Sequence, residues 1–399
     1  MKPNGKTIVL LGAILVLISI GDNARTAGMG YVQTNLVSNG AVPAAHIDPN
    51  LINPWGISFL PGLSPFWVSD NNAGVTTLYD GTGVPFPPPP SPSPLVVDIP
   101  SPADPTHGGK TGAPTGQVAN LTALTPTPAF DIKIPEPNGT DFGPAFFIFA
   151  TEDGAIEAWN LNKMIEPDGT PSPDLGFPDD AVIVVDNSAN GAVYKGLAMG
   201  EAGGNPLLYA TNFRTGNIDV FDGNFQPTVL SGSFTDPNVQ HGYAPFGIQN
   251  IEGNLWVTYA MQDAAKHDPV NKPAHGFVSV FDTDGNLIRH FTQHGHLNSP
   301  WGVAMAPASF GQFAGDILVG NFGNGKINVY DPATGHWLGT LTKPDGNPII
   351  NPGLWTVTFS GPAGQTATGA DPDTLYITAG LTGPTHELAG LFAKISPNP

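Results

Sequence analysis

The stretch that decides the fold is Leu297–Leu341, LNSPWGVAMAPASFGQFAGDILVGNFGNGKINVYDPATGHWLGTL. It divides into four short runs of β-forming residues separated by turn residues, which predicts a four-stranded up-and-down sheet. A lone sheet of this kind leaves both faces and both edges uncovered, so we expect neighbours of the same kind. The expected strands are Trp301–Ala306, Asp316–Gly320, Lys326–Tyr330 and His336–Leu341.

The third run of this stretch recurs along the chain. Its six copies are TTLYD, IEAWN, IDVFD, VSVFD, INVYD and LFAKIS. The copies lie about 50 to 80 residues apart, a spacing that suits four-stranded units with insertions. Six such units predict an all-β fold, a six-bladed β-propeller. Gly116–Leu121 is the weakest match, and we assign it as the first strand of blade two.

The sixth copy reaches the end of the sequence after its third strand. The segment Tyr31–Ser38, YVQTNLVS, precedes the first blade and has strand-like composition. We therefore expect it to pair with Gly390–Ser396 as the outer strand of the last blade. This pairing would close the ring and remove two exposed sheet edges.

The N-terminus carries the pattern of a secretory signal. Lys2 and Lys6 precede a mostly apolar run, Ile8–Ile20, and a small polar stretch follows. The run is shorter than the roughly 20 residues that a membrane helix needs, although a retained N-terminal anchor remains the alternative. The pattern predicts a signal peptide over residues 1–27, a single propeller domain over 28–399, and a secreted or periplasmic protein with no membrane span after signal removal.

The composition excludes some classes of partner and cross-link. The 399 residues carry a formal net charge of −19, which opposes binding to nucleic acid. The sequence has no Cys, so disulfides are excluded, and its 50 Gly and 43 Pro fit many tight turns between short strands.

We expect Pro85–Pro94 to form a polyproline loop, Leu95–Ile99 to be the fourth strand of blade one, and Asp263–His267 to be a short helix. A monomer is the expected state.

Alternating strand directions place two sets of loops on one face of a propeller, around the mouth of the central channel. These are the loops between blades and the loops between the second and third strands. Their oxygen-bearing, basic and aromatic side chains suit ligand binding, but Asn and Asp at strand ends are more often turn formers, and Trp after Pro is more often packed between blades. The candidate ligand-binding residues are Asp70, Asn71, Glu152, Asn212, Arg214, Gln262, Asp263, Asn321, Trp55 and Trp301.

Most of the histidines also map to this rim, His107 and His386 among them. The longest rim loop, Met261–Gly276, is the most site-like stretch. Carboxylate and amide oxygens from several blades could bind Ca²⁺, and imidazoles could bind Zn²⁺, which would then polarise a substrate or activate water. The candidate metal ligands are His267, Asp268, His241 and His294. The sequence leaves open whether any metal is bound.

Two resemblances follow from these motifs. PWGVAM, DILVGNF and KINVYD resemble NHL repeats, whose propellers are typically six-bladed. NPWGISF, FIFATEDGAIEAWN, LYATNFRTGNIDVFD and LWVTYAMQDAAKHD resemble a family of exported bacterial proteins of unassigned function. The resemblance implies a propeller, export and a bacterial source, and it implies no reaction.

Three functions stay open. No nucleophile elbow, Ser/His/Asp order, GxGxxG or Walker loop is present, so a recognition module for a small molecule, a glycan or an exported protein is favoured. The alternative is a metal-dependent hydrolase or lyase, with the candidate metal ligands above as ligands or acid/base groups and Glu152 and Asn212 assisting. A passive envelope component is the third. Three or more converging His and carboxylate side chains would favour the enzyme.

Overall fold

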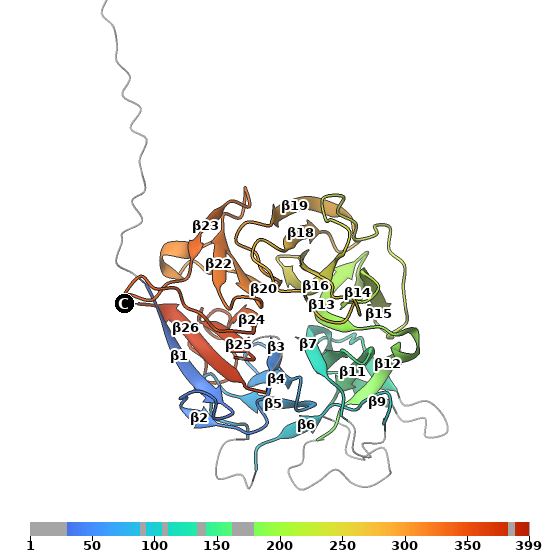
Figure 1. Ribbon diagram of the computed structural model, residues 1–399. Helices are drawn as coiled ribbons and strands as arrows, with labels where there is room; N and C mark the ends of the chain where they lie inside the picture. The colour runs from blue at the N-terminus through green and yellow to red at the C-terminus, as the bar shows by residue number, and fades with distance from the viewer. Residues whose placement is uncertain are drawn as a thin grey trace, which may run out of the picture.

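Six β-sheets stand around a central axis in the computed structural model, which describes residues 30–87, 93–105, 111–133, 141–161, 179–381 and 388–398 (Figure 1). The six-bladed β-propeller predicted from the repeats is confirmed. The predicted signal peptide, His107 and His386 lie outside the described residues. None of the helices in the described ranges has the length and apolar composition to cross a membrane.

The first three blades follow the chain in order, each starting with its innermost strand. Blade one contains β3 (Pro54–Ser58), β4 (Phe66–Asp70), β5 (Val75–Tyr79) and β6 (Val96–Asp98). Blade two contains β7 (Pro114–Ala119), β10 (Phe147–Thr151), β11 (Ala155–Trp159) and β12 (Val182–Asp186). Blade three contains β13 (Tyr194–Ala202), β14 (Asn205–Asn212) and β15 (Asn217–Asp222). Outside the blades, β8 (Asp131–Lys133) pairs with β9 (Asp141–Pro144).

The last three blades continue the ring. Blade four contains β16 (Tyr243–Ile251), β17 (Asn254–Met261), β18 (Phe277–Phe281) and β19 (Leu287–Gln293). Blade five contains β20 (Pro300–Met305), β21 (Ile317–Asn321), β22 (Ile327–Tyr330) and β23 (Trp337–Thr340). Blade six contains β24 (Leu354–Phe359), β25 (Leu375–Ala379), β26 (Leu391–Pro397) and β1 (Tyr31–Ser38). The short β2 (His46–Ile47) runs parallel to β1 at the sheet edge.

The pairing of β1 with β26 confirms the predicted closure of the ring. The two strands are antiparallel, with Tyr31 opposite Pro397 and Ser38 opposite Leu391. Tyr31, Leu36 and Val37 are buried in the cores of the adjoining blades. The N-terminal strand therefore supplies both the missing outer edge and apolar surface for the core.

A glycine near the start of the innermost strands lets neighbouring blades approach closely. A Cβ added to Gly247 would lie 2.1 Å from the main-chain oxygen of Trp301 in the next blade. One added to Gly116 would lie 2.5 Å from the main-chain nitrogen of Leu197. The recurring Gly of the PWG-type motif is thus required by blade-to-blade contact around the axis.

Threonine hydroxyls on the second strands of blades three, four and six tie each of these blades to the next. Thr211 Oγ1 donates to the Phe246 carbonyl at 3.0 Å, and Thr258 Oγ1 donates to the Trp301 carbonyl at 3.2 Å. Thr378 Oγ1 reaches the Trp55 carbonyl at 2.5 Å and so links blade six to blade one. These bonds satisfy carbonyl groups buried between sheets.

Some expectations need correction. Blade three has three strands, because residues 223–242 leave β15 and cross to blade four, where Gly232 and Phe234 bond to main-chain carbonyls of Asp284 and Gly285. Blade two begins at Pro114 rather than Gly116. The expected helix Asp263–His267 is a sequence of turns and bends. The helices of the described ranges are short 3-10 turns, η1 (Leu121–Leu124), η2 (Ser188–Asn190) and η3 (Gly311–Phe313).

Candidate functional site

Aromatic side chains fill the channel beneath the mouth predicted to bind ligands. Trp55 stacks on Trp355 with ring centroids 3.4 Å apart, and Trp355 stacks on Phe322 at 4.1 Å. Trp301 lies edge-on to both tryptophans at 6.1 and 6.0 Å. Phe246 joins the same cluster. This aromatic plug occupies the axis, so the predicted ligand residues Trp55 and Trp301 pack on other rings.

Four of the plug residues share one position in the repeat, the second residue of the PWG-type motif. Aligning the six innermost strands places there, in blade order, Trp55, Thr115, Lys195, Phe246, Trp301 and Trp355. Blade three thus puts a cation where four other blades put an aromatic ring. Lys195 is thus the one charged residue among the six aligned positions.

Lys195 is fully buried, with 0% of its side chain exposed. Its Nζ forms an ion pair with Oε1 of Glu152 and lies 3.6 Å from Oδ1 of Asp268. The same Nζ lies 5.2 Å from the ring centroid of Trp55 and 5.9 Å from that of Phe213, which places it within cation–π distance of both. Two carboxylates and two rings therefore compensate the desolvation of this ammonium group.

Glu152 reaches the cluster from the turn between β10 and β11 in blade two. Its side chain is 14% exposed, and its Oε2 accepts a hydrogen bond of 3.2 Å from Asn71 Nδ2 in blade one. The neighbouring Asp153 accepts a 2.7 Å bond from the main-chain nitrogen of Ala113. Burial raises the pKa of Asp153 above its usual value. The hydrogen bond from Asn71 therefore holds this turn of blade two against blade one.

The loop between β17 and β18 brings Asp268 and His267 over this pair. Oδ1 of Asp263 accepts hydrogen bonds from the main-chain nitrogens of His267 at 2.8 Å and Asp268 at 3.3 Å, which closes the loop tip. Gln262 Nε2 bonds to the main-chain oxygens of Phe213 and Arg214 and so anchors the base of the loop on blade three.

His267 and Asp268 form the exposed part of the cluster. His267 Nδ1 lies 2.9 Å from Asp268 Oδ1, and their side chains are 38% and 66% exposed. The hydrogen bond with Asp268 is the main cause that raises the pKa of His267. The same bond, supported by the charge of Lys195, lowers the pKa of Asp268. At neutral pH the loop thus presents a charged carboxylate.

Glu152, His267 and Asp268 also meet a geometric condition for metal binding. One ligand atom from each lies within 4.8 Å of the others, and among the described residues no other group of three or more His or acidic residues does so. Lys195, however, already places a cation between two of them. Two unit charges 4 Å apart interact with about 4 kcal/mol at an effective dielectric constant of about 20, so the ammonium opposes a divalent ion here.

Several predicted site residues lie elsewhere or act within the fold. Asp70 is fully buried, accepts a 2.6 Å bond from Thr77, and has a pKa raised mainly by burial, so it is not on the rim surface. Asn212 donates to Asp219 at 3.0 Å, and Asn321 donates to the His296 carbonyl at 3.0 Å. Both asparagines therefore act as turn and strand caps.

The remaining predicted residues stay outside the Lys195 cluster. The Arg214 and His241 side chains are exposed, and His294 lies 3.0 Å from the Ala274 carbonyl through its Nδ1. Neither His241 nor His294 belongs to the group of potential metal ligands. The predicted set of metal residues is thus split, with only His267 and Asp268 brought together.

Sequence reasoning missed Lys195. It lies within YKGLAM, which the repeat identifies as an innermost strand, and such strands are expected to supply packing residues. The available signal was the alignment of YKG with PWG and PFG, in which a charged residue stands at an aromatic position. Charge at a repeat position that is otherwise uncharged indicates a local role beyond packing.

The chain is similar in sequence to proteins of a virus. No family model matches it. Uncharacterized protein R648 of Acanthamoeba polyphaga mimivirus is 30% identical over 326 residues, which cover 80% of this chain and 71% of the viral protein. Uncharacterized protein L690 of the same virus is 32% identical over 331 residues, 80% of this chain and 76% of that protein. The chain belongs to the family of these proteins. They are viral and give no support to the expected kinship with exported bacterial proteins.

Solved structures are similar to the chain at low sequence identity. A streptogramin B lyase structure is 12% identical, with a TM-score of 0.44 and coverage of 93% of this chain and 98% of that chain. The soluble aldose sugar dehydrogenase from Escherichia coli, in its apo-form, is 11% identical, with a TM-score of 0.49 and coverage of 92% and 100%. Likeness at this level carries no argument about activity.

Proposed function

We propose that the chain is a recognition module that binds a neutral, hydroxyl-rich small molecule, such as a mono- or disaccharide, at the mouth formed by Lys195, Glu152, His267 and Asp268. The observation that supports this most is the fully buried Lys195 ammonium beneath two carboxylates. A buried charge network at a channel mouth is costly to stability, and such networks cluster at functional sites.

The ligand class follows from which groups face solvent. Lys195 is enclosed, whereas Asp268, His267 and part of Glu152 are accessible. Carboxylates are strong hydrogen-bond acceptors, and an imidazole can donate or accept. Hydroxyl groups match this mixture because each one both donates and accepts. An anionic ligand would meet two carboxylates and a chain of net charge −19, so we expect it to be disfavoured.

Thermal-shift assays with matched sugars test this function. Glucose, galactose and their disaccharides should raise the melting temperature, whereas glucuronate, in which a carboxylate replaces the C6 hydroxymethyl group of glucose, should raise it less. Glucosamine, in which an ammonium group replaces the C2 hydroxyl, serves as the cationic match. Asp268→Asn and His267→Ala should reduce the shift, and Asp345→Asn, in an exposed turn away from the site, should not. A larger shift with glucuronate than with glucose, or no shift with any neutral sugar, would overturn the proposal.

A metal-dependent hydrolase or lyase is the second candidate, because the ligand atoms of Glu152, His267 and Asp268 lie within 4.8 Å of one another. Bound metal would act there as a Lewis acid. Elemental mass spectrometry of the chain purified without chelator distinguishes the two candidates. Stoichiometric zinc, manganese or iron that is lost in His267→Ala would favour the enzyme over the recognition module.

A further inference from the structure

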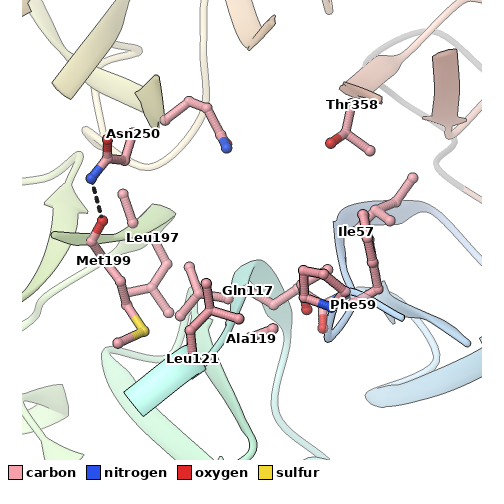
Figure 2. A pocket seen from close by; sticks show the side chains of 14 residues that line it. Ile57, Phe59, Gln117, Ala119, Leu121, Leu197, Met199, Asn250 and Thr358 are labelled. Carbon is pink, nitrogen blue, oxygen red and sulfur yellow. Dashed lines mark hydrogen bonds between the residues drawn. The ribbon is translucent and has the colours of Figure 1, made fainter. Parts of the chain in front are cut away.

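A second cavity lies at the opposite end of the central channel, on the far side of the aromatic plug. Its volume is about 210 Å³, and it is lined by residues toward the ends of innermost strands, where the strands leave the axis (Figure 2). Blades one, two, three, four and six contribute side chains. A smaller cavity of about 30 Å³ continues toward Trp301, whose ring belongs to the plug. This lower cavity is therefore separated from the Lys195 cluster.

The lining of the lower cavity carries no charge. None of its 14 residues is Asp, Glu, Lys, Arg or His. Ile57, Phe59, Leu197 and Met199 supply apolar surface, and Figure 2 shows these side chains around the hollow. A charged ligand entering it would lose hydration without gaining a counter-charge, so the cavity selects against ions.

Two amide side chains of the wall are held in place by the main chain. Gln117 Nε2 donates to the Gly56 and Trp67 carbonyls, both at 2.7 Å. Asn250 Nδ2 donates to the Met199 carbonyl at 2.8 Å, the dashed line in Figure 2. These bonds fix the wall of the cavity before any ligand arrives, which reduces the ordering cost of binding.

Three other polar side chains retain free hydrogen-bonding capacity, one of them Ser58, whose buried Oγ has no partner in the described part of the chain. Within the described ranges, neither the amide of Gln249 nor the hydroxyl of Thr358 has a protein hydrogen-bond partner, and both residues line the cavity. Thr358 lies across the hollow from Met199 and Asn250 (Figure 2). A ligand in between can therefore contact apolar side chains and bond to one or two neutral groups.

We propose that the lower cavity binds a small neutral molecule that combines an apolar ring or short chain with one hydroxyl or amide group. Its volume lies below the roughly 300 to 1,000 Å³ of sites for drug-sized ligands, so the ligand is correspondingly small. Apolar burial supplies affinity, and the Thr358 hydroxyl and Gln249 amide orient the polar group. This site is independent of the sugar-binding mouth.

Ligand-observed NMR with three matched probes tests the proposal on the full chain. Benzyl alcohol is the neutral probe, and benzoate and benzylamine are its anionic and cationic counterparts. Benzyl alcohol should bind, and the charged probes should bind at least about tenfold more weakly, a difference of about 1.4 kcal/mol. Equal binding of either ion, or no binding of benzyl alcohol, would overturn the assignment.

Cavity-filling variants locate the binding. Thr358→Phe and, separately, Met199→Phe place a ring in the hollow and should abolish benzyl alcohol binding. Ile288→Phe, at a half-exposed position on β19 that does not line the cavity, is the matched control and should bind as the unmodified protein does. Unchanged binding in both filled variants, with melting temperatures that show they are folded, would contradict the assignment. Asp268→Asn should leave it unaffected, so failure here is distinct from failure of the sugar site.

Discussion

Lys195 Nζ lies 3.6 Å from Asp268 Oδ1, although the two residues come from different blades. Lys195 belongs to the innermost strand of blade three, and Asp268 to the loop between β17 and β18 of blade four. With Glu152 of blade two, the contact joins three neighbouring blades at the channel mouth. An enclosed cation thus contributes to holding the exposed carboxylate of the loop.

Replacing Lys195 by Met should lower the free energy of unfolding by about 3 kcal/mol, because Glu152 would lose its partner in a largely buried position. Glu152→Gln alone should also destabilise the fold, because the buried ammonium would keep only Asp268 and the two rings as compensation. The double variant should lose less than the sum of the two, as measured by denaturant unfolding. Strictly additive losses would show that the ion pair makes no net contribution.

The His267–Asp268 contact should respond to pH at both ends of a window. The pKa of His267 is raised above 6.5, so its contribution to stability is complete below that pH and is lost as pH rises through the folded value. The pKa of Asp268 is lowered below 3.8, so its contribution is present above 3.8 and is lost as pH falls through the folded value. The contact is therefore strongest between the two folded-state pKa values.

An NMR titration of the His267 ring measures this coupling. The unmodified chain should give a pKa above 6.5, and Asp268→Asn should bring it down toward that value, since the hydrogen bond with Asp268 is the main cause of the shift. His241→Ala, at an exposed position outside the cluster, is the control. A His267 pKa at or below 6.5 in the unmodified chain would rule out the contact in solution.

Deleting residues 28–40 should lower the melting temperature sharply. The deletion removes β1, exposes the edge of β26, and takes away three buried apolar side chains, Tyr31, Leu36 and Val37. Each fully buried side chain of this size is worth about 1.5 to 3 kcal/mol. Calorimetric melting curves make the comparison, and an unchanged curve would contradict a closing role for β1.

Gly247→Ala should destabilise the ring because the new methyl group would lie 2.1 Å from the Trp301 main-chain oxygen. We expect a loss of about 2 to 4 kcal/mol, since backbone on both sides must shift. Gly223→Ala, whose nearest contact is the Ala129 side chain at 3.0 Å, should lose less. Chemical denaturation of both variants measures which one loses more free energy of unfolding. Equal losses would refute the requirement for close approach of the blades at Gly247.

Export remains a prediction from residues 1–27. Expression of the full sequence in a bacterial host should yield mature protein outside the cytoplasm, with an N-terminus near residue 28 by mass spectrometry. Lys2→Glu together with Lys6→Glu should slow processing, because the basic flank of a signal peptide would be lost. Intact protein that stays in the cytoplasm would refute export.

Most of the fold could be predicted because a propeller repeats one local pattern. The PWG-type start, the apolar second strand and the Asp-containing turn each mark a strand, and the missing outer strand of blade six indicated the pairing of Tyr31–Ser38 with β26. Blade three departed from the pattern because residues 223–242 make contacts with blade four that no local signal encodes.

The site was less predictable because it depends on which side chains meet across blades. Glu152, His267 and Asp268 could be placed on one rim from loop order, yet the same reasoning included Asp70, Asn212 and Asn321, which are used within the fold. Burial of these polar groups results from tertiary packing, so the spacing of residues in the sequence does not indicate it. Lys195 was left out because it lies inside a strand, whereas the search for site residues considered loops.

The most direct test of the account is an isothermal titration of the sugar that gives the largest thermal shift into the unmodified chain, Asp268→Asn and Asp345→Asn. We predict saturable binding at one site for the unmodified chain and Asp345→Asn, with affinity reduced at least about tenfold in Asp268→Asn. Equal affinities in all three proteins would contradict the assignment of the Lys195 cluster as the binding site.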